Sequence, residues 1–256
     1  MKAMIFCAGL GTRLRPITDT LPKALLPLGG KTLLQHQIER LQAAGISDIV
    51  INVHHLPDQI VRFLQQHNNF GCRIAVSDES NRLLNTGGGL LKATPLLCGD
   101  SEPVLACNVD ILSNIDIPAF VCAHRPDAMA TLVVSDRRTQ RYLLFDGEDR
   151  MRGWTNIATG EVRPRELQGL TGGLRPLAFS GMQILSPQLF PLLQEYAQAH
   201  DAAAADSQRG VFSLIDLYVG LCSRHTLRAY VPDGYRMMDV GKIGLLQEAE
   251  RFAESL

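Results

Sequence analysis

Hydrophobic residues in the first half of the chain follow two patterns that alternate along the sequence. One is a short, nearly continuous apolar run, which predicts a buried strand; these runs lie at residues 2–8, 48–53, 73–76 and 103–107. The other is an apolar residue at every third or fourth position, which predicts a helix; these segments lie at 34–41, 58–66 and 88–97. Strands and helices that alternate in this way form right-handed βαβ units, so an α/β fold with a mostly parallel sheet is expected.

The pattern changes after residue 127. Short apolar runs separated by polar turns predict a small antiparallel insertion, with strands at 130–134, 142–145 and 151–154. The run at 177–185 is expected to rejoin the main sheet. Proline suits the first turn of a helix, so a helix is expected to begin at Ser186 and Pro187.

The last part of the chain is predicted to contain a hairpin and a final helix. Apolar runs at 227–231 and 235–238 flank Pro232-Asp233-Gly234, a sequence typical of a hairpin turn. The helix is predicted at 242–253, and residues 200–210 are expected to form a surface loop. No internal repeat and no flexible linker interrupts the sequence, so we expect one domain, residues 1–256, with an inserted subregion.

Composition narrows the class of protein. The chain has 256 residues, with 25 Lys and Arg against 26 Asp and Glu, so its net charge is −1, whereas a nucleic-acid-binding protein usually has a basic excess. No apolar run approaches the roughly 18 residues that span a bilayer. The six cysteines include no Cys-x-x-Cys pair, which indicates a reducing, cytoplasmic compartment rather than a disulfide framework.

Residues 9–16 form a glycine- and arginine-containing loop directly after the first predicted strand. Glycines let backbone N–H groups approach a ligand closely, and such groups bind phosphate oxygens well. A dinucleotide-binding Gly-x-Gly-x-x-Gly motif would need glycine at the position of Leu14, and a P-loop ending at Thr32 would need glycine at the position of Leu25. Both motifs are therefore rejected.

Positive charge distinguishes this loop. Arg13, Arg15 and Lys23 lie within a short stretch, and the chain has only 5 lysines beside 20 arginines. A lone lysine among the apolar neighbours at 21–27 favours a functional role over simple solvation. Ammonium and guanidinium groups both suit phosphate oxygens, so a triphosphate is the expected ligand. An ordinary solvated surface loop is the alternative interpretation.

Three further segments place candidate residues beside predicted strands or helices. Residues 84–90 contain three consecutive glycines at a predicted helix start, where a flat ring could lie against bare backbone or a phosphate could meet the helix N-terminus. A flexible turn is the alternative. Asp110 and Asp239 each follow a predicted strand, and α/β sheets bind ligands at such strand ends. An aspartate that caps the next segment is the less favoured alternative for Asp110. Mg²⁺ commonly takes one or two carboxylates plus substrate phosphates, so these two are expected to hold Mg²⁺ if they meet in space.

Together these segments resemble the sugar-1-phosphate nucleotidyltransferase family. The family signature Gly-x-Gly-Thr-Arg-Leu-Arg-Pro, followed by Pro-Lys-x-Leu-x-Pro, occurs here at residues 9–16 and 22–27. The resemblance continues through the Thr-Gly-Gly-Gly loop, Asp110, residues 179–181 and residues 239–241, so it covers nearly the whole chain. Within the family, the compact length and that loop look most like N-acetylmuramate 1-phosphate uridylyltransferases, with mannose- and heptose-1-phosphate guanylyltransferases as the alternative.

The resemblance implies a fold, an activity and partners. The fold is a three-layer Rossmann-like nucleotidyltransferase fold, a mixed, mostly parallel sheet with helices on both faces. Its nucleotide-binding half would be residues 1–127, and its sugar-binding half, with the second metal ligand, residues 128–256. The implied activity is transfer of a nucleotidyl group from a nucleoside triphosphate to a sugar 1-phosphate, with UTP and N-acetylmuramate 1-phosphate as the expected pair, in nucleotide-sugar biosynthesis for the cell wall. No nucleic acid or membrane partner is expected, and the chain is expected to act as a monomer or homodimer.

The resemblance also implies residue roles. Catalysis would fall to Arg13 and Lys23, and Mg²⁺ to Asp110 and Asp239. The implied contacts to the nucleotide are Ala8, Gly9, Gly11, Thr12, Arg13, Thr86, Gly87 and Gly88, and those to the sugar are Asn108, Gly153, Ser180 and Gly181.

The chain departs from the family pattern at three places. Val109 precedes the metal aspartate, where Gly or Ser is common, and Asn85 precedes Thr86, where the uridylyl branch often has Glu. A Glu-Lys-Pro sugar-binding segment is absent between Gly153 and Phe179, so residues 141–169 are expected to take its place. A non-catalytic nucleotide-sensing homologue is a further alternative, whereas Leu14 disfavours a dinucleotide-dependent oxidoreductase.

Overall fold

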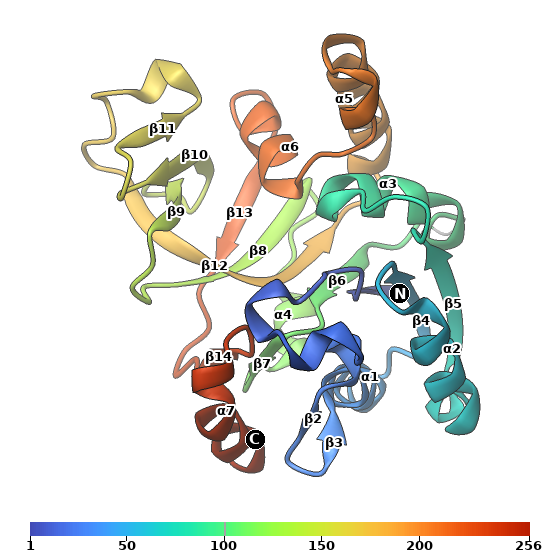
Figure 1. Ribbon diagram of the computed structural model, residues 1–256. Coiled ribbons are helices and arrows are strands. Elements are labelled where there is room, and N and C mark those ends of the chain that lie inside the picture. The colour runs from blue at the N-terminus through green and yellow to red at the C-terminus, as the bar shows by residue number, and fades with distance from the viewer. Residues whose placement is uncertain (100) are drawn as a thin grey trace.

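A sheet of ten strands runs through the part of the chain that the computed structural model describes, residues 1–99 and 101–256, and helices cover both of its faces (Figure 1). The α-helices are α1 (Leu33–Ala43), α2 (Pro57–Gln66), α3 (Asn85–Leu97), α4 (Ile117–Cys122), α5 (Leu189–Ala203), α6 (Leu214–Leu221) and α7 (Leu246–Glu254). The strands of the first half are β1 (Lys2–Phe6), β2 (Pro27–Leu28), β3 (Lys31–Thr32), β4 (Asp48–Val53), β5 (Arg73–Asp78), β6 (Val104–Asn108) and β7 (Ile111–Ser113). Those of the second half are β8 (Ala130–Ser135), β9 (Arg141–Phe145), β10 (Met151–Asn156), β11 (Glu161–Arg163), β12 (Arg175–Leu185), β13 (Leu227–Tyr230) and β14 (Met237–Asp239).

The parallel part of the sheet is built around β1. This strand pairs with β4 on one side and with β6 on the other, and β5 extends the sheet beyond β4. The chain goes from β1 to β4 and β5 and then returns to β6, so the strand order reverses between β1 and β6. Ligands in such sheets bind at the carboxyl ends of the strands beside the reversal. Phe6 and Asn108, which lie opposite each other at these two ends, therefore mark the expected site.

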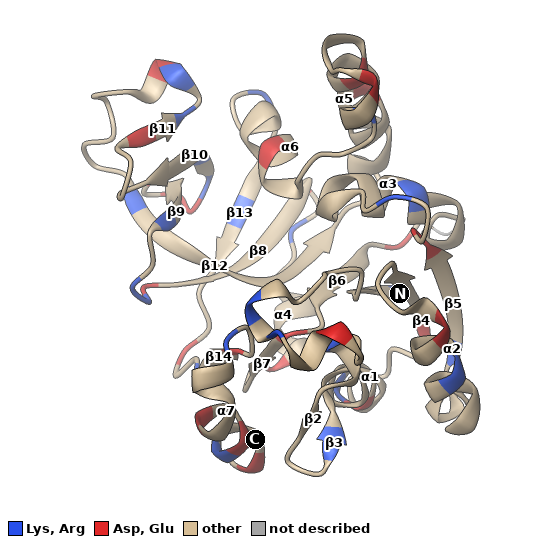
Figure 2. Ribbon diagram, viewed as in Figure 1, with Lys and Arg blue, Asp and Glu red and all other residues tan. Residues whose placement is uncertain are grey.

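Residues along β1 alternate between two hydrophobic cores. Ala3 and Ile5 pack into the core covered by α1, α2, α4 and α7, and Met4 and Phe6 pack into the core covered by α3, α5 and α6. Figure 2 shows the charged residues mainly on the helices and loops around the sheet, and β6 carries none. The expected mixed sheet with helices on both faces is confirmed. Among the described residues, no helix is both long and apolar enough to cross a membrane.

The antiparallel insertion begins later in the chain than predicted. β9, β10 and β11 pair in antiparallel fashion, as expected for a meander, and β9 joins the sheet along the first residues of β12. The run at 130–134, however, belongs to the main sheet as β8, between β12 and β13. All six residues of β8 are buried, and a strand buried on both faces belongs inside a sheet rather than at its margin.

The predicted C-terminal hairpin is wrong. β13 pairs in parallel with β8, and β14 pairs in antiparallel fashion with β7, so the turn at 232–234 connects strands of two different sheets. The fully buried Leu227 explains part of this, since pairing with β8 places it inside the core. The predicted loop at 200–210 is also shorter than expected, because α5 continues to Ala203 through alanines that favour a helix.

Candidate active site

A cavity of about 300 Å³ lies at the carboxyl ends of β1 and β6. Its lining brings together eight of the residues singled out from the sequence: Gly9, Gly11, Thr12, Arg13, Lys23, Thr86, Asn108 and Asp110. Phe6, Cys7, Val109 and Gly241 complete the lining. The loop after β1, the segment around Lys23 and the end of β6 therefore face one another across a single cavity.

The shape of the loop after β1 depends on Gly11. This residue has φ +63°, a left-handed conformation, and its carbonyl oxygen accepts a hydrogen bond of 2.9 Å from the Thr18 hydroxyl. A Cβ at this position would lie only 2.8 Å from Thr18 Cγ2. Gly11 thus allows the chain to fold back tightly, and the short 3-10 helix Thr12–Leu14 that follows places the exposed Arg13 on the cavity while Leu14 is buried.

Lys23 and Asp110 form an ion pair inside the cavity. The ammonium group of Lys23 donates to Asp110 Oδ2, and the lysine is only 8% exposed. Lys23 begins a short 3-10 helix, Lys23–Leu25, in which Ala24 and Leu25 are buried and hold the lysine at the site. A buried ammonium without a partner would be costly, so the Asp110 carboxylate compensates it.

Asp239 reaches the same edge through β14. The N–H of Val240 donates to the carbonyl oxygen of Asp110 over 2.9 Å, and Asp239 lies opposite Ile111 in the pairing of β14 with β7. A Cβ on Gly241 would lie 2.6 Å from both Arg13 Nη2 and Asp239 Oδ1. The main chains of the two aspartates therefore lie side by side, and the side chains of Arg13 and Asp239 both lie close to Gly241.

The donor set at this edge fits a hard divalent cation that keeps open positions. No group of three or more His, Cys, Asp or Glu residues able to hold a metal occurs among the described residues, so a closed, all-protein metal site is not found there. Mg²⁺ does not need one, because one or two carboxylates combined with substrate phosphates satisfy it. Asp239 is exposed, and Asp110 is shared only with Lys23 among the described ion pairs.

The three glycines of residues 87–89 have a packing role. They lie inside α3, which begins at Asn85, and are buried. A Cβ on Gly87 would lie 2.4 Å from Phe212, and a Cβ on Gly88 would lie 1.9 Å from the carbonyl oxygen of Gly210. The N–H groups of Gly87 and Gly88 both point to the carbonyl oxygen of Phe212, at 2.9 and 3.2 Å. The sequence predicted that the backbone of these glycines would be open to a nucleotide. Instead, residues 210–212 cover it, because the absence of side chains at 87 and 88 lets that segment approach the helix.

A second cavity of about 370 Å³ adjoins the first and shares Phe6, Gly9 and Thr86 with it. The rest of its lining is Ala8, Asn52, Leu83, Asn85 and Val211. The two cavities form one continuous depression, charged near Lys23 and largely apolar near Leu83 and Val211. A nucleoside triphosphate likewise has a charged end, its phosphates, and a less polar end, its base.

A buried polar chain that the sequence reasoning missed supports this depression. Asn52 Oδ1 accepts a hydrogen bond of 2.8 Å from the Cys7 N–H, and Asn52 Nδ2 donates to Glu79 Oε1 over 2.7 Å. Glu79 is 1% exposed and accepts from the Leu84 N–H, and burial raises the pKa of its carboxyl group. The chain ties the end of β1 to the start of α3. The sequence offered one indication of this chain of hydrogen bonds, since Asn52 is a polar residue within the apolar run at 48–53.

The expected sugar-binding residues fall into two groups. Asn108 lines the cavity, and a Cβ on Gly181, which has φ +72°, would lie 3.0 Å from Asn108 Nδ2; Ser180, next to Gly181, is buried. Gly153 is separated from this group. It lies in β10, where a Cβ would be 2.4 Å from the carbonyl oxygen of Arg163, so its lack of a side chain serves the packing of the insertion.

Residues 2–144 match the family described as nucleotidyl transferase. Two similar proteins are named N-acetylmuramate alpha-1-phosphate uridylyltransferase. The one from Caulobacter vibrioides is 32% identical over 241 residues, which cover 92% of this chain and 90% of the relative. The one from Neisseria meningitidis serogroup B is 38% identical over 191 residues, 74% of this chain and 77% of the relative. Among solved structures, a UDP-glucose pyrophosphorylase complexed with UDP-glucose has the same fold, with a TM-score of 0.74 at 18% identity over 100% of this chain and 99% of that one.

Proposed function

The chain belongs to the nucleotidyl transferase family, and on this basis we propose that it transfers a nucleotidyl group from a nucleoside triphosphate to a sugar 1-phosphate. The observation that carries the proposal is the convergence of Arg13, Lys23 and Asp110 on one cavity, with Asp239 at its edge. The two basic side chains can bind the oxygens of a polyphosphate, and the two carboxylates can hold the Mg²⁺ that accompanies it.

In the proposed reaction, an oxygen of the sugar 1-phosphate attacks the α-phosphorus of the nucleoside triphosphate in line. The bond from the α-phosphorus to the bridging oxygen breaks, and pyrophosphate leaves with the electron pair. The attacking phosphate oxygen is already anionic, so no general base is required. The work of the protein is therefore positioning and charge stabilisation, as in phosphoryl transfer generally.

Each charged group has a place in this scheme. Arg13, exposed at the cavity, binds the leaving pyrophosphate together with the backbone of the loop at 9–12. Lys23 exchanges its contact with Asp110 for oxygens of the α-phosphate and the attacking phosphate. Asp110 and Asp239 are the residues that would hold Mg²⁺, and the ion, when bound, neutralises negative charge on phosphate oxygens.

UTP and N-acetylmuramate 1-phosphate are the proposed substrates, since two relatives that span most of the chain carry that activity in their names. The test is a matrix of the four nucleoside triphosphates against N-acetylmuramate, N-acetylglucosamine and mannose 1-phosphates, read by pyrophosphate release and by product mass. The highest kcat/KM is expected for UTP with N-acetylmuramate 1-phosphate. A preference for GTP and mannose 1-phosphate would replace that pair by the guanylyltransferase alternative, and no pyrophosphate from any pair would overturn the proposed activity.

A further inference from the structure

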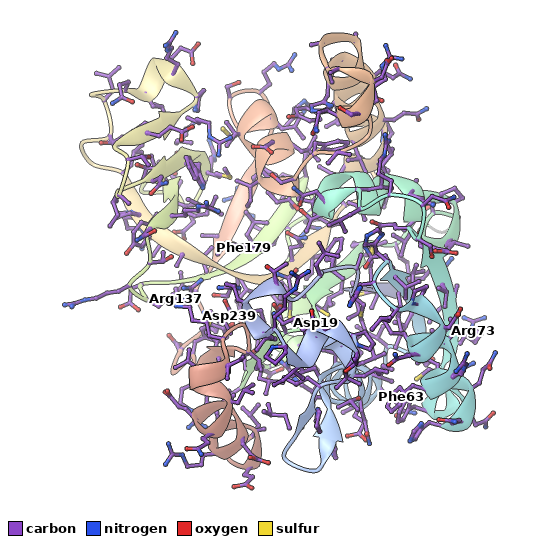
Figure 3. The ribbon with its side chains drawn as sticks, in the orientation of Figure 1. Asp19, Phe63, Arg73, Arg137, Phe179 and Asp239 are labelled. Carbon is purple, nitrogen blue, oxygen red and sulfur yellow. The ribbon has the colours of Figure 1, made fainter. Side chains whose placement is uncertain are left out.

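Arg137 is held by a main-chain contact to the strand segment that borders Asn108. It lies in the loop between β8 and β9, and its Nη2 donates to the carbonyl oxygen of Phe179 over 3.0 Å. Phe179 stands on β12 two residues before Gly181, whose Cα packs against Asn108 of the cavity lining. Figure 3 shows Arg137, Phe179 and Asp239 in the same part of the molecule, away from Phe63 and Arg73.

Tyr235 gives a second indication of where this guanidinium lies. The hydroxyl of Tyr235 faces Ser180 and Ser113, and although burial raises its pKa, the nearby charges of Arg40 and Arg137 act in the opposite direction. The geometric anchor is the hydrogen bond to Phe179, the residue before Ser180, which holds the Arg137 guanidinium near the Ser180–Gly181 turn. The hydrogen bond to Phe179 therefore places Arg137 next to the segment that borders Asn108.

No carboxylate among residues 1–99 and 101–256 pairs with Arg137. Six arginines of the second half pair with carboxylates, namely Arg150, Arg152, Arg163, Arg175, Arg209 and Arg228. Among the described residues, no carboxylate lies within 4.0 Å of Arg137, Arg138 or Arg141 in the loop that follows β8 and the start of β9. One Nη2–H of Arg137 is used by Phe179, and its exposed guanidinium retains donors for a planar anion.

We propose that Arg137 binds a carboxylate carried by the sugar of the sugar 1-phosphate, and so selects an acidic sugar over its neutral counterpart. This inference rests on the proposed function. The sugar phosphate itself belongs at Lys23, inside the cavity, whereas Arg137 lies beyond Gly181 and meets a substituent remote from the reacting phosphorus. N-Acetylmuramate has such a substituent, because it is N-acetylglucosamine with a lactyl ether that ends in a carboxylate.

The experiment compares N-acetylmuramate 1-phosphate with N-acetylglucosamine 1-phosphate, two substrates that differ only by the lactyl group, at saturating UTP. Steady-state KM and kcat are measured for the wild-type chain, Arg137→Met, Arg137→Lys and the matched control Arg62→Met. Arg62 is exposed on α2, at the opposite end of the sheet, and its substitution changes the net charge equally. Thermal midpoints of all four proteins show that each is folded.

Arg137→Met is expected to raise KM for the acidic sugar by about 10-fold or more, as for loss of a hydrogen bond to a charged group, and to leave kcat within about twofold. KM for the neutral sugar stays unchanged, Arg137→Lys gives an intermediate KM because it keeps the charge without the fork, and Arg62→Met behaves as wild type. Equal effects of Arg137→Met on both sugars, or none on either, overturn the inference while the proposed function stands. A wild-type chain that turns over neither sugar with UTP overturns the inference and the proposed substrate pair, and the matrix of the four nucleoside triphosphates then decides whether the proposed activity stands.

Discussion

Lys23 and Asp110 form a direct ion pair although they lie 87 residues apart in the sequence. In the proposed reaction each partner binds another group: Lys23 binds phosphate oxygens, and Asp110 binds Mg²⁺. The pair therefore holds two reactive groups in position and gives a largely buried lysine an ionic partner until substrates replace each partner by an oppositely charged group.

Replacing either partner is expected to abolish most of the activity without unfolding the chain. Lys23→Ala and Asp110→Ala should each lower kcat about 10²–10³-fold, the usual loss when one charged contact to a developing anion is removed. Pyrophosphate release gives the rate, and circular dichroism gives the fold. Lys31→Ala is the control, because Lys31 pairs with Glu39 on the surface. Near-normal turnover of folded Asp110→Ala would remove its assignment as a metal ligand.

Asp239→Asn is expected to weaken the response to Mg²⁺ more than the binding of UTP. The substitution removes one of two carboxylates at the edge of the cavity, and even indirect partners of metal ligands change metal affinity 10–100-fold, so the half-saturating Mg²⁺ concentration should rise at least about 10-fold. The measurement is activity after treatment with a chelator, followed by titration with Mg²⁺. Asp233→Asn, an exposed acid in the preceding turn, serves as the control. An unchanged Mg²⁺ titration for Asp239→Asn would exclude it as a ligand.

Gly88→Ala is expected to destabilise the chain and to raise KM for the nucleoside triphosphate. The new methyl group would overlap the carbonyl oxygen of Gly210, and overpacking of this kind costs about 1–3 kcal/mol in free energy of unfolding. Displacement of residues 210–212 also removes Val211 from the wall of the second cavity. Urea denaturation and initial rates test both effects. Gly147→Ala, where no atom lies within 4 Å of the added Cβ, should behave as wild type; the same behaviour for Gly88→Ala would show that α3 tolerates a side chain there.

His124 is expected to make the folded chain less stable below neutral pH. Its ring nitrogens bond to the hydroxyls of Thr131 and Ser186, at 2.8 and 3.0 Å, and burial lowers the pKa of the imidazole below its usual value. As pH falls from about 7 to 5, the unfolded chain binds the proton more readily than the folded chain, so the free energy of unfolding decreases. His124→Gln removes this group and should flatten the pH dependence measured by urea denaturation, whereas exposed His67→Gln should not. Parallel curves for wild type and His124→Gln would contradict the assignment.

The parts of the site that lie close together in the sequence could be predicted from it. The loop at 9–16 and Lys23 follow one strand within a short stretch, so their types and spacing were sufficient to single out residues that line the cavity. β1, β4, β5 and β6 were also predictable, because strands buried on both faces leave apolar runs that are hard to mistake.

Features that depend on distant partners could not be predicted. The short runs around β13 and β14 looked like the two arms of a hairpin, since nothing local shows that β8 and β7 offer them longer or more buried pairings. The role of Gly88 depends on Gly210, more than a hundred residues away, and the same glycines would fit a ligand or a packed segment equally well. Arg137 could not be singled out from the sequence, because only its hydrogen bond to the distant carbonyl oxygen of Phe179 distinguishes it from other surface arginines.

β12 runs through both parts of the sheet, and its regular pairing with β8 is interrupted between Phe179 and Gln183, where Gly181 has a left-handed backbone. Residues before the interruption pair with β9, and residues after it pair with β6. One strand therefore carries the β9–β11 meander at one end and borders the cavity lining at the other, with Gly181 between the two. Since a Cβ on this glycine would crowd Asn108, the same strand fixes both where the meander joins the sheet and how closely the backbone approaches the cavity wall.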